Sequence, residues 1–490
     1  MTTAFEEIAA TAQDQLVPGI NFAVSDTASY VLQRRFASFF PSTGSDYAPN
    51  GQTVLRFQIS SPTDYFDLAT LQLQMTIANT GAQDLIIPGG PMTLFTRWRI
   101  YVGGTLAEDI LEAHRLTRMI DLMTPLDRLR SESISQLGEN EQIFKTASLP
   151  AIPAGAIPAQ QLDLAPATNP WGEGYSSNRV ERIEPNTSRT IVARIKCSGL
   201  LGNTHYWLPG RFPLVIEATV TSDPLTSVAS WDTVAGAALS TAFVIRSPKI
   251  LVDQVQLDPY VNETISKQLQ DGGKLPMIYS TYFTSRHTLA NIAPAAGQSW
   301  QVMLSRAFSR VQSLFVSFYS PRGCGRGAGD TRQTQCEATC FLNWHGKPNY
   351  NTFNAVNPYQ PASGEGFRFQ IGLGSTLWPD IPMGSMAEAW YQLSKLMGMP
   401  SSASGCSITP NEYLGTSFLI GLDLERSSAT PGSGRAALTG IPSRSAGDNL
   451  RVSFDNVQPR DAPSCPTTMF VTMHVNAILE LRDEGCSYYD

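Results

Sequence analysis

The stretch TTMFVTMHVNAILEL (residues 467–481) decides the fold class of this 490-residue chain, together with the shorter FPLVIEATV (residues 212–220). In the longer stretch every second residue is apolar and polar residues are prominent between them; the apolar set is Met469, Val471, Met473, Val475, Ala477, Leu479 and Leu481. Because successive side chains of a β-strand point to opposite faces, this period of two predicts a half-buried antiparallel strand. One such strand closes each half of the chain, so the sequence predicts one strand plan used twice.

Shorter alternating runs precede each closing stretch. They are TVLRFQIS (53–60) and LQLQMTIA (71–78) in the first half, and MIYSTYFTS (277–285) and FRFQIGLG (367–374) in the second. WRIYVGGTLAEDI (98–110) predicts two strands joined at Gly103-Gly104, because glycine supplies the positive φ that a tight hairpin needs. The chain therefore predicts a β-sandwich in each half.

Three helical segments interrupt the strands. LEAHRLTRMIDLM (111–123) repeats apolar residues every three or four positions and is stopped by Pro125. A second helix is expected near residues 260–269, with Tyr260, Val261, Ile265 and Leu269 on its buried stripe. SMAEAWYQLSKLMG (385–398) begins with Ser385 and Glu388 spaced as a capping box.

We expect four segments along the chain. Residues 1–50 form an N-terminal arm whose apolar patches order only on assembly, and residues 51–258 form the first sandwich. Residues 259–275 form a connector helix, and residues 276–490 form the second sandwich. Long loops rich in Gly, Pro and Ser are expected at 147–174, 320–339 and 426–448.

The composition is that of a protein covered in part by copies of itself. Charged residues make up 16% of the chain, below the roughly 25% of typical soluble domains, alongside 33 prolines and 38 glycines. The net charge of −7 is unfavourable for electrostatic binding of nucleic acid by the whole chain. One local cluster, YVLQRRFASFF (30–40), carries Arg34 and Arg35; two arginines neutralise few phosphates, so contact with a neighbouring subunit is the favoured interpretation.

The N-terminal residues MTTAFEEIAATAQDQ contain two glutamates and no basic region, so we expect no secretory signal in them. No stretch approaches 18 uninterrupted apolar residues, which is unfavourable for a transmembrane helix.

Catalytic motifs are missing from the sequence, and we expect neither catalytic residues nor a cofactor. The five histidines form no HExxH and no His-x-His pair, and no G-x-S-x-G elbow or Walker A loop occurs. His474, on the less apolar face of the closing strand, is expected to be structural or to lie in an interface. The acidic pair Glu108 and Asp109 is expected to compensate the dipole of the following helix.

One cysteine cluster has the makings of a metal site. Cys336, Cys340 and His345, with Cys324 upstream, could hold zinc in a loop. The cluster lacks the C-x2-C spacing of common zinc sites, which favours the alternative of unpaired, oxidisable thiols.

Several phrases together resemble a known family: WRIYVGGTLAEDI, HYWLPGRFPLVIEATV, FVIRSPKILVDQVQLDPYV, GLGSTLWPDIPMGSMAEAWYQLSKLMG and TSFLIGLDLE. Their order over residues 50–482 resembles the double jelly-roll major capsid proteins of eukaryotic double-stranded DNA viruses, of the polinton-like virus and virophage type. The resemblance implies an all-β fold of two tandem antiparallel jelly-roll β-sandwiches with short inserted helices.

The resemblance also implies a function without catalysis. Homotrimers would form pseudo-hexagonal capsomers that tile an icosahedral shell around a double-stranded DNA genome, and the location would be the virion. The implied partners are further copies of the chain, penton proteins and minor capsid proteins, without sequence-specific binding of nucleic acid. Whether a lipid layer lies inside the shell stays open.

Two other function classes remain as alternatives. A carbohydrate-binding β-sandwich, such as a lectin or a receptor-binding viral protein, would use aromatic platforms, for which Trp171, Trp231 and Trp344 are candidates. An enzyme on a cupin-like scaffold is disfavoured by the missing metal triad.

Overall fold

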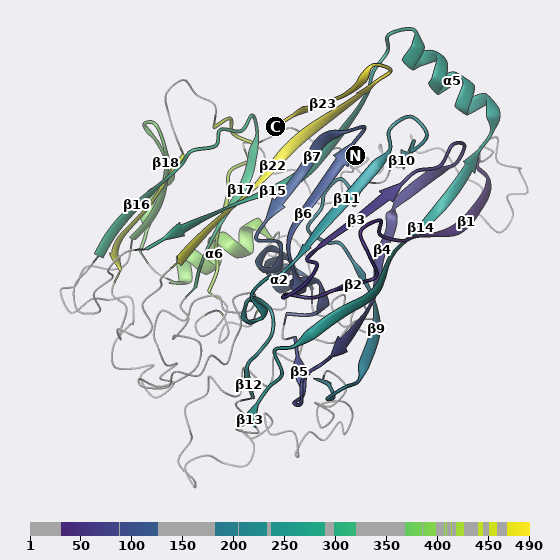
Figure 1. Cartoon of the computed structure of the whole chain (residues 1–490). Coiled ribbons are helices and arrows are strands. Elements are labelled where there is room, and N and C mark those ends of the chain that lie inside the picture. The colour runs from purple at the N-terminus through teal and green to yellow at the C-terminus, as the bar shows by residue number, and fades with distance from the viewer. Residues whose placement is uncertain are drawn as a thin grey trace, which may run out of the picture.

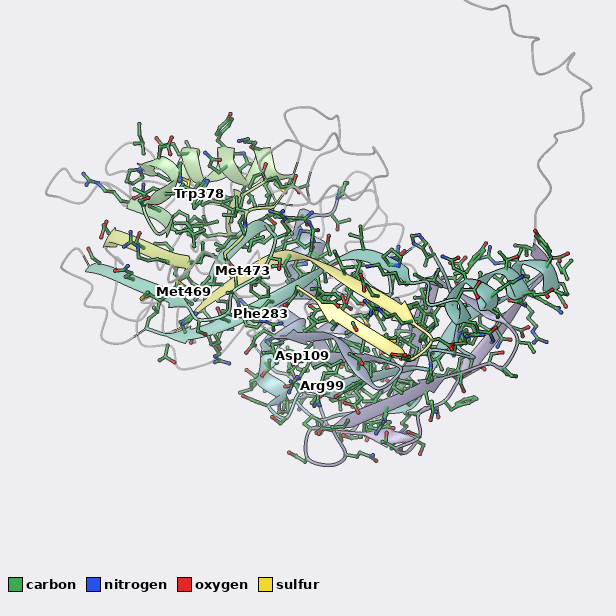
Figure 2. The ribbon with its side chains drawn as sticks, turned by 90° about the horizontal axis from the view of Figure 1, so that it is seen from above. Arg99, Asp109, Phe283, Trp378, Met469 and Met473 are labelled. Carbon is green, nitrogen blue, oxygen red and sulfur yellow. The ribbon has the colours of Figure 1, made fainter. Side chains whose placement is uncertain are left out.

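The computed structural model describes residues 31–87, 89–125, 182–203, 205–232, 237–289, 298–319, 368–384, 386–397, 406, 408, 413, 418–425, 440–443, 450–457 and 468–490. Strands dominate this part of the chain and form two β-sandwiches that lie side by side (Figure 1). In the view from above, Arg99 and Asp109 mark the first sandwich, and Met469 and Met473 mark the second (Figure 2). None of the described helices is long and apolar enough to cross a membrane.

The first sandwich consists of two antiparallel sheets. The larger sheet contains β1 (Val31–Phe39), β14 (Phe243–Leu257), β4 (Tyr65–Asn79) and β10 (Tyr206–Trp207) in that order, with β2 (Asp46–Tyr47) paired to β14 and β9 (Ser188–Arg194) paired to β4. The smaller sheet contains β3 (Val54–Ile59), β11 (Leu214–Val220), β6 (Phe95–Val102) and β7 (Thr105–Leu111). Short pieces complete this half: β5 (Leu85–Ile86), β8 (Arg182–Ile183), β12 (Trp231–Asp232), β13 (Ala237–Ala238), and the 3-10 turns η1 (Pro91–Leu94) and η4 (Pro224–Thr226).

The second sandwich is built in the same way. Its larger sheet contains β15 (Leu275–Thr288), β22 (Thr468–Arg482), β17 (Val311–Tyr319) and β20 (Ile420–Asp423), with β23 (Gly485–Tyr489) paired to β22. Its smaller sheet contains β16 (Gln298–Leu304), β21 (Leu450–Val457), β18 (Arg368–Leu373) and β19 (Thr376–Met383).

The strand order confirms that one strand plan is used twice, but it corrects the predicted pair of closing strands: the stretch at 212–220 contains β11, which corresponds to β21, and the counterpart of β22 is β14. The series β1-β14-β4-β9 corresponds to β15-β22-β17-β20, and β3-β11-β6-β7 corresponds to β16-β21-β18-β19. In each half a helix follows the last strand of the smaller sheet: α2 (Ala113–Met123) follows β7, and α6 (Met386–Leu396) follows β19. The β6–β7 hairpin turns at Gly103 and Gly104 with φ of 54° and 88°, as the Gly-Gly pair predicts.

The helix α5 (Pro259–Gln270) lies between the last strand of the first sandwich and the first strand of the second. The Asp258 carboxylate accepts a hydrogen bond from the Tyr260 backbone N–H at 2.8 Å and so caps its first turn. Val261 and Ile265 pack over Val255 and Leu257, and Leu269 is buried. Tyr260, expected on the buried stripe, is 69% exposed, because it lies in the first turn, opposite the packed face.

Part of the expected N-terminal arm is a strand of the first sandwich. Residues 31–39 form β1, whose backbone pairs with β14, whereas residues 1–30 lie outside the described residues. The strand was not evident in the sequence because most of its residues are exposed, and strict alternation arises only where one face is buried. The expected loops at 147–174 and 320–339, and most of 426–448, lie outside the described residues.

The closing strand β22 is more buried than a half-exposed strand. Its seven alternating apolar residues are no more than 1% exposed, as predicted. On its other face, however, Phe470, Thr472 and Asn476 are also buried. This second face lies against the first sandwich, and that contact is described next.

Candidate functional site at the seam between the sandwiches

The sequence-predicted metal site cannot be placed, since Cys324, Cys336, Cys340 and His345 lie outside the described residues. Trp171, Trp344 and the side chain of Trp231 lie outside them as well. Within the part of the chain that the structure describes, no group of three His, Cys, Asp or Glu side chains could hold a metal ion.

Arg34 and Arg35 are engaged inside the chain. The Arg34 Nε donates to Asp253 at 2.7 Å, and another nitrogen of the same guanidinium donates to Asp67 at 3.0 Å. Arg35 donates to Asp64 and to the Gln254 side chain. These bonds fasten β1 to its sheet and neutralise both arginines, which leaves them unsuited to contact phosphates.

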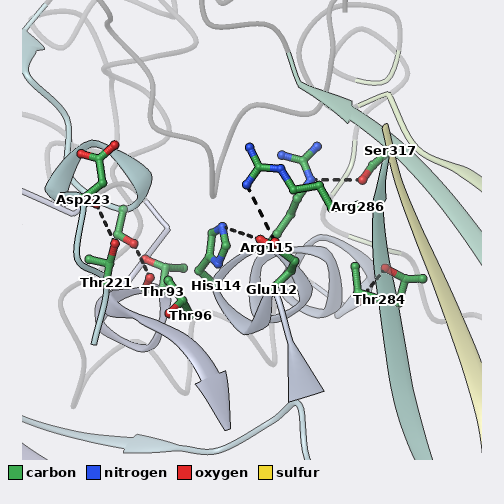
Figure 3. Close-up of polar contacts among 12 residues, drawn as sticks. Thr93, Thr96, Glu112, His114, Arg115, Thr221, Asp223, Thr284, Arg286 and Ser317 are labelled. Atoms are coloured by element: carbon green, nitrogen blue, oxygen red, sulfur yellow. Dashed lines mark hydrogen bonds and ion pairs between the residues drawn. The ribbon is translucent and has the colours of Figure 1, made fainter. Parts of the chain in front are cut away.

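The described residues best placed to act together are at the seam between the two sandwiches. We use "seam" for the contact of β7, α2 and residues 197–203 with β15, β17, β22 and β23. Arg115 on α2 crosses it: its side chain is buried, its Nε donates to Ser317 Oγ at 3.1 Å, and its guanidinium donates to the Phe318 carbonyl (Figure 3). The guanidinium also lies 4.4 Å from the centre of the Phe470 ring. This contact explains why the second face of β22 is covered.

Glu112 and His114 extend this junction at the start of α2 (Figure 3). One Glu112 carboxylate oxygen lies 3.8 Å from Arg286 of β15, and the other lies 3.6 Å from His114 Nε2. Neither ring nitrogen of the buried His114 has a hydrogen-bond partner among the described residues. Burial, reinforced by the charges of Arg115 and Arg286, lowers the pKa of His114 to about 3, so the imidazole is neutral at physiological pH.

Glu108 has a different role from the one expected. It lies in β7 and is buried, with its carboxyl group bonded to Ser198 Oγ and to the backbone N–H groups of Gly199 and Leu200 at 3.1 and 3.3 Å. Its neighbour Asp109 pairs with Arg97 through two bonds of 2.6 and 2.7 Å. The assignment of this pair to the helix dipole is therefore wrong, because Asp109 is paired with Arg97 and Glu108 is bonded to the 198–200 loop and, across the seam, to the Thr281 side chain of β15. Burial raises the pKa of Glu108 to about 7 against the opposing effect of its hydrogen bonds.

The loop that Glu108 holds lies directly on the second sandwich. A Cβ added at Gly199 would lie 1.6 Å from the Ser280 carbonyl oxygen of β15, so only glycine fits there. On either side, the Tyr279 hydroxyl donates to the Ala107 carbonyl at 2.9 Å, and the Thr105 hydroxyl donates to the Cys486 carbonyl at 3.2 Å. The apolar residues around these contacts form one contiguous core that includes both sandwiches.

His474 lies on the face of β22 that carries Phe470 and Thr472. Its ring stacks on Tyr282 of β15, with ring centres 4.5 Å apart and an angle of 16° between the ring planes. Burial lowers the pKa of His474 to about 4 and raises the pKa of Tyr282 to about 12. This placement agrees with the prediction of a structural or interface histidine.

The seam is suited to a mechanical role. Its charged and polar side chains are buried and bond to one another or to backbone groups, which fixes the two sandwiches in one arrangement. Sequence reasoning gave Glu108 a different role and missed Arg115 and Gly199. The one sequence signal for Glu108 and Arg115 is that each charge lies in a segment of otherwise apolar period.

Comparison with known proteins extends the description of the fold. The sequence matches no protein-family model and no curated protein sequence. Among solved structures, it is similar to a Sputnik virophage chain with a TM-score of 0.57 at 12% identity, covering 97% of this chain and 92% of that one. It is similar to the PBCV-1 virus capsid chain with a TM-score of 0.52 at 12% identity, covering 96% and 99%. The chain has the double jelly-roll fold. The Faustovirus major capsid protein is similar to both jelly rolls as well, with a TM-score of 0.51 at 9% identity, covering 97% of this chain and 94% of that one.

Proposed function

We propose that this chain is a major capsid protein whose homotrimers form pseudo-hexagonal capsomers that tile an icosahedral shell around a double-stranded DNA genome. The observation that carries the proposal is the extent of the structural similarity. The match extends over 97% of this chain and 94% of the Faustovirus major capsid protein, so it includes both jelly rolls. Fold alone does not determine function, so the proposal also needs physical support from the chain itself.

The seam provides that support. A capsomer needs two jelly rolls held at a fixed angle, because six of them must form one regular block. Buried polar bonds from Arg115, Glu108 and Tyr279 and a continuous apolar core hold the two at such an angle here. A low charged fraction of 16% suits a surface that is largely covered by neighbouring copies.

The proposed partners follow from the same role. They are other copies of this chain within and between capsomers, with penton and minor capsid proteins at the remaining positions of the shell, and the proposed location is the virion. The net charge of −7 and the internal pairing of Arg34 and Arg35 support a shell that encloses nucleic acid without recognising its sequence. We further propose that residues 51–258 and 276–490, joined by 259–275, are the two building units, with β1 added to the first.

The proposed role is structural rather than enzymatic. Glu108 and His114, an acid and a base with strongly shifted pKa values, are buried in the seam. A cavity of about 220 Å³ lies nearby and is lined by Ile120, Thr124, Arg194, Ile195, Lys196, Ser198 and Gly202. This described lining contains no aromatic side chain, so it does not favour the carbohydrate-binding alternative.

The test is the solution mass and shape of the purified full-length chain. Sedimentation should give three times the 53.4 kDa of one chain, and negative-stain images should show particles of hexagonal outline or closed shells. A stable monomer at micromolar concentration would contradict the proposal and would call for glycan-array and metal analysis of the same sample.

A further inference from the structure

The two equivalent helices differ in how much of their surface is covered. Nine of the 11 residues of α2 are buried, because one side packs in its own jelly roll and the other packs on the second jelly roll. The helix α6 is buried only on the side of Ala389 and Leu393, which faces β20. Its opposite side is open, and there Tyr391 is 58% exposed. The described residues thus cover the outer side of α2 and leave the outer side of its counterpart uncovered.

The strands that correspond to one another on the other side of the seam also differ in exposure. The strand β15, which receives the first jelly roll, has no fully exposed run, whereas its counterpart β1 is exposed at most positions. Leu32 and Phe36 of β1 are 59% and 66% exposed, and Phe40 just beyond it is 66% exposed. Scattered exposed apolar residues need no explanation, but these lie on β1, and its counterpart β15 contacts the first jelly roll in the seam.

The exposed residues of β1 belong to a continuous surface of the sheet. The register places Phe36 beside Asp253, Asp253 beside Asp67, and Asp67 beside Tyr206, which makes one row across β1, β14, β4 and β10. Arg34 bridges the two carboxylates in the middle of this row. The row therefore presents aromatic rings at both ends and, between them, one guanidinium shared by two carboxylates. Aromatic and arginine side chains of this kind are enriched in the centres of protein interfaces.

We propose that α6 and β19 of one copy dock on β1 and on the outer face of β14 and β4 of a second copy. This contact repeats between copies the seam that α2 and β7 make with β15, β22 and β17 within one chain. On the donor side the exposed residues are Tyr391 on α6 and Ile381 on β19, the latter 82% exposed. The inference rests on the proposed function, since it names the surfaces that join the copies of a capsomer.

The geometry of the chain favours a second copy over an unrelated partner. The helix α6 and the strand β1 belong to different jelly rolls and lie well apart (Figure 1), so one chain cannot join its own two surfaces. A head-to-tail contact between different patches either closes into a ring or continues as a filament. In the proposed trimer, three copies joined by the relation that the internal seam already makes would place six jelly rolls in one ring. In that ring no copy has an open α6 or β1 surface.

The test uses one charged substitution on each surface of the full-length chain. Phe36→Asp and Tyr391→Asp should each weaken association by at least about thirtyfold per contact, measured by sedimentation equilibrium, as for the loss of an interface hot spot. Met303→Asp is the matched control: the residue is 59% exposed on β16, a strand that belongs to neither surface, and the change should leave the mass unchanged. Circular dichroism and thermal unfolding check that each variant is folded.

Mixing the two variants distinguishes a head-to-tail contact from a symmetric one. The Phe36→Asp chain keeps its α6 surface, and the Tyr391→Asp chain keeps its β1 surface, so an equimolar mixture should form pairs of one copy each and no trimers. A wild-type monomer would overturn the proposed function and this inference with it. A wild-type trimer that withstands both substitutions would overturn the inference alone, as would variants that dissociate but form no mixed pair.

Discussion

Glu108 is a buried carboxyl group, and its burial disfavours the ionised form. Its folded-state pKa of about 7 lies above the ordinary value of 4.5, so the folded chain holds a proton that the unfolded chain has released. The free energy of unfolding should therefore fall as pH rises from about 4.5 to about 7, by about 3 kcal/mol from this one group, and stay level above that. Glu108→Gln should abolish this component of the pH dependence, because the amide keeps the shape of the protonated acid without the ionisation.

Urea unfolding of both proteins at pH 5 and pH 8 checks this expectation. The variant should be more stable than the wild type at pH 8, with a much smaller difference at pH 5. Glu184→Gln, which changes an exposed carboxyl of the same jelly roll, is the control and should leave the profile unaltered. Equal pH profiles for wild type and Glu108→Gln would show that the carboxyl is ionised and stabilised by the N–H groups of Gly199 and Leu200.

His474 is expected to make the seam sensitive to acid. Its pKa falls from 6.5 to about 4 on folding, so the unfolded chain binds the extra proton as pH drops. Stability should be fully present above pH 6.5 and decrease by about 3 kcal/mol toward pH 4. His474→Phe should retain the stack on Tyr282 and remove this loss, raising the midpoint of thermal unfolding at pH 4.5 but not at pH 7.5. A gain of the same size at both pH values would point to better packing rather than to protonation.

Single residues show where sequence reasoning stops. The alternation of Met469 to Leu481 predicted which face of β22 is in the core, because the period of a strand is local. The burial of Glu108 could not be predicted, because its partners at residues 198–200 and the covering β15 are distant in sequence. A charged residue next to a predicted helix gives the same sequence pattern whether its side chain is exposed to solvent or buried.

At the scale of elements, α2 connects the two jelly rolls through Arg115. Arg115→Ala should lower the free energy of unfolding by about 3 kcal/mol, since the Phe318 carbonyl and the Ser317 hydroxyl would lose a buried, charged donor. Arg56→Ala is the matched control, because Arg56 is 54% exposed and its nitrogen lies 3.7 Å from Glu217. That surface pair should contribute less than about 1 kcal/mol. Chemical denaturation of the three proteins at pH 7.5 compares them, and similar values for both variants would mean that α2 contributes little to the seam.

Helices and strands could be predicted from sequence best where one face is buried in the core and the other is exposed to solvent. Strands with one face in the core, such as β3 and β11, alternate between buried and less buried residues and were found from sequence. The edge strand β1 was taken for part of an arm because most of it is exposed, although ion pairs of Arg34 and Arg35 fasten it to the sheet. For α2 the sequence indicated the correct span but a single apolar stripe. Its remaining surface is covered by the second jelly roll through polar contacts, which no helical period predicts.

At the scale of the whole molecule, duplication explains both the internal seam and the surfaces left open. Because the two jelly rolls have the same topology, each carries both surfaces of the seam contact, a helix surface and a strand surface. Within one chain the α2 and β15 surfaces are covered by that contact, whereas the α6 and β1 surfaces stay exposed. The sequence indicated the duplication but paired the wrong strands, because the stretch at 212–220 is β11, the counterpart of β21, whereas the counterpart of β22 is β14. It could not indicate the seam, because that contact depends on the relative rotation of the two units.

The net charge of the chain leads to a final prediction about assembly. Each copy carries −7, so copies repel one another at long range, while the proposed contact surfaces present aromatic side chains and Arg34 is already paired within its own chain. Raising salt from about 0.05 to about 0.5 M shortens the screening length severalfold and should strengthen the trimer, lowering its dissociation constant. An assembly held by pairing with nucleic-acid phosphates would respond in the opposite sense and dissociate steeply with salt. Sedimentation of nuclease-treated protein at the two salt concentrations separates the cases, and salt-induced dissociation would place ion pairs, not apolar burial, at the contact between copies.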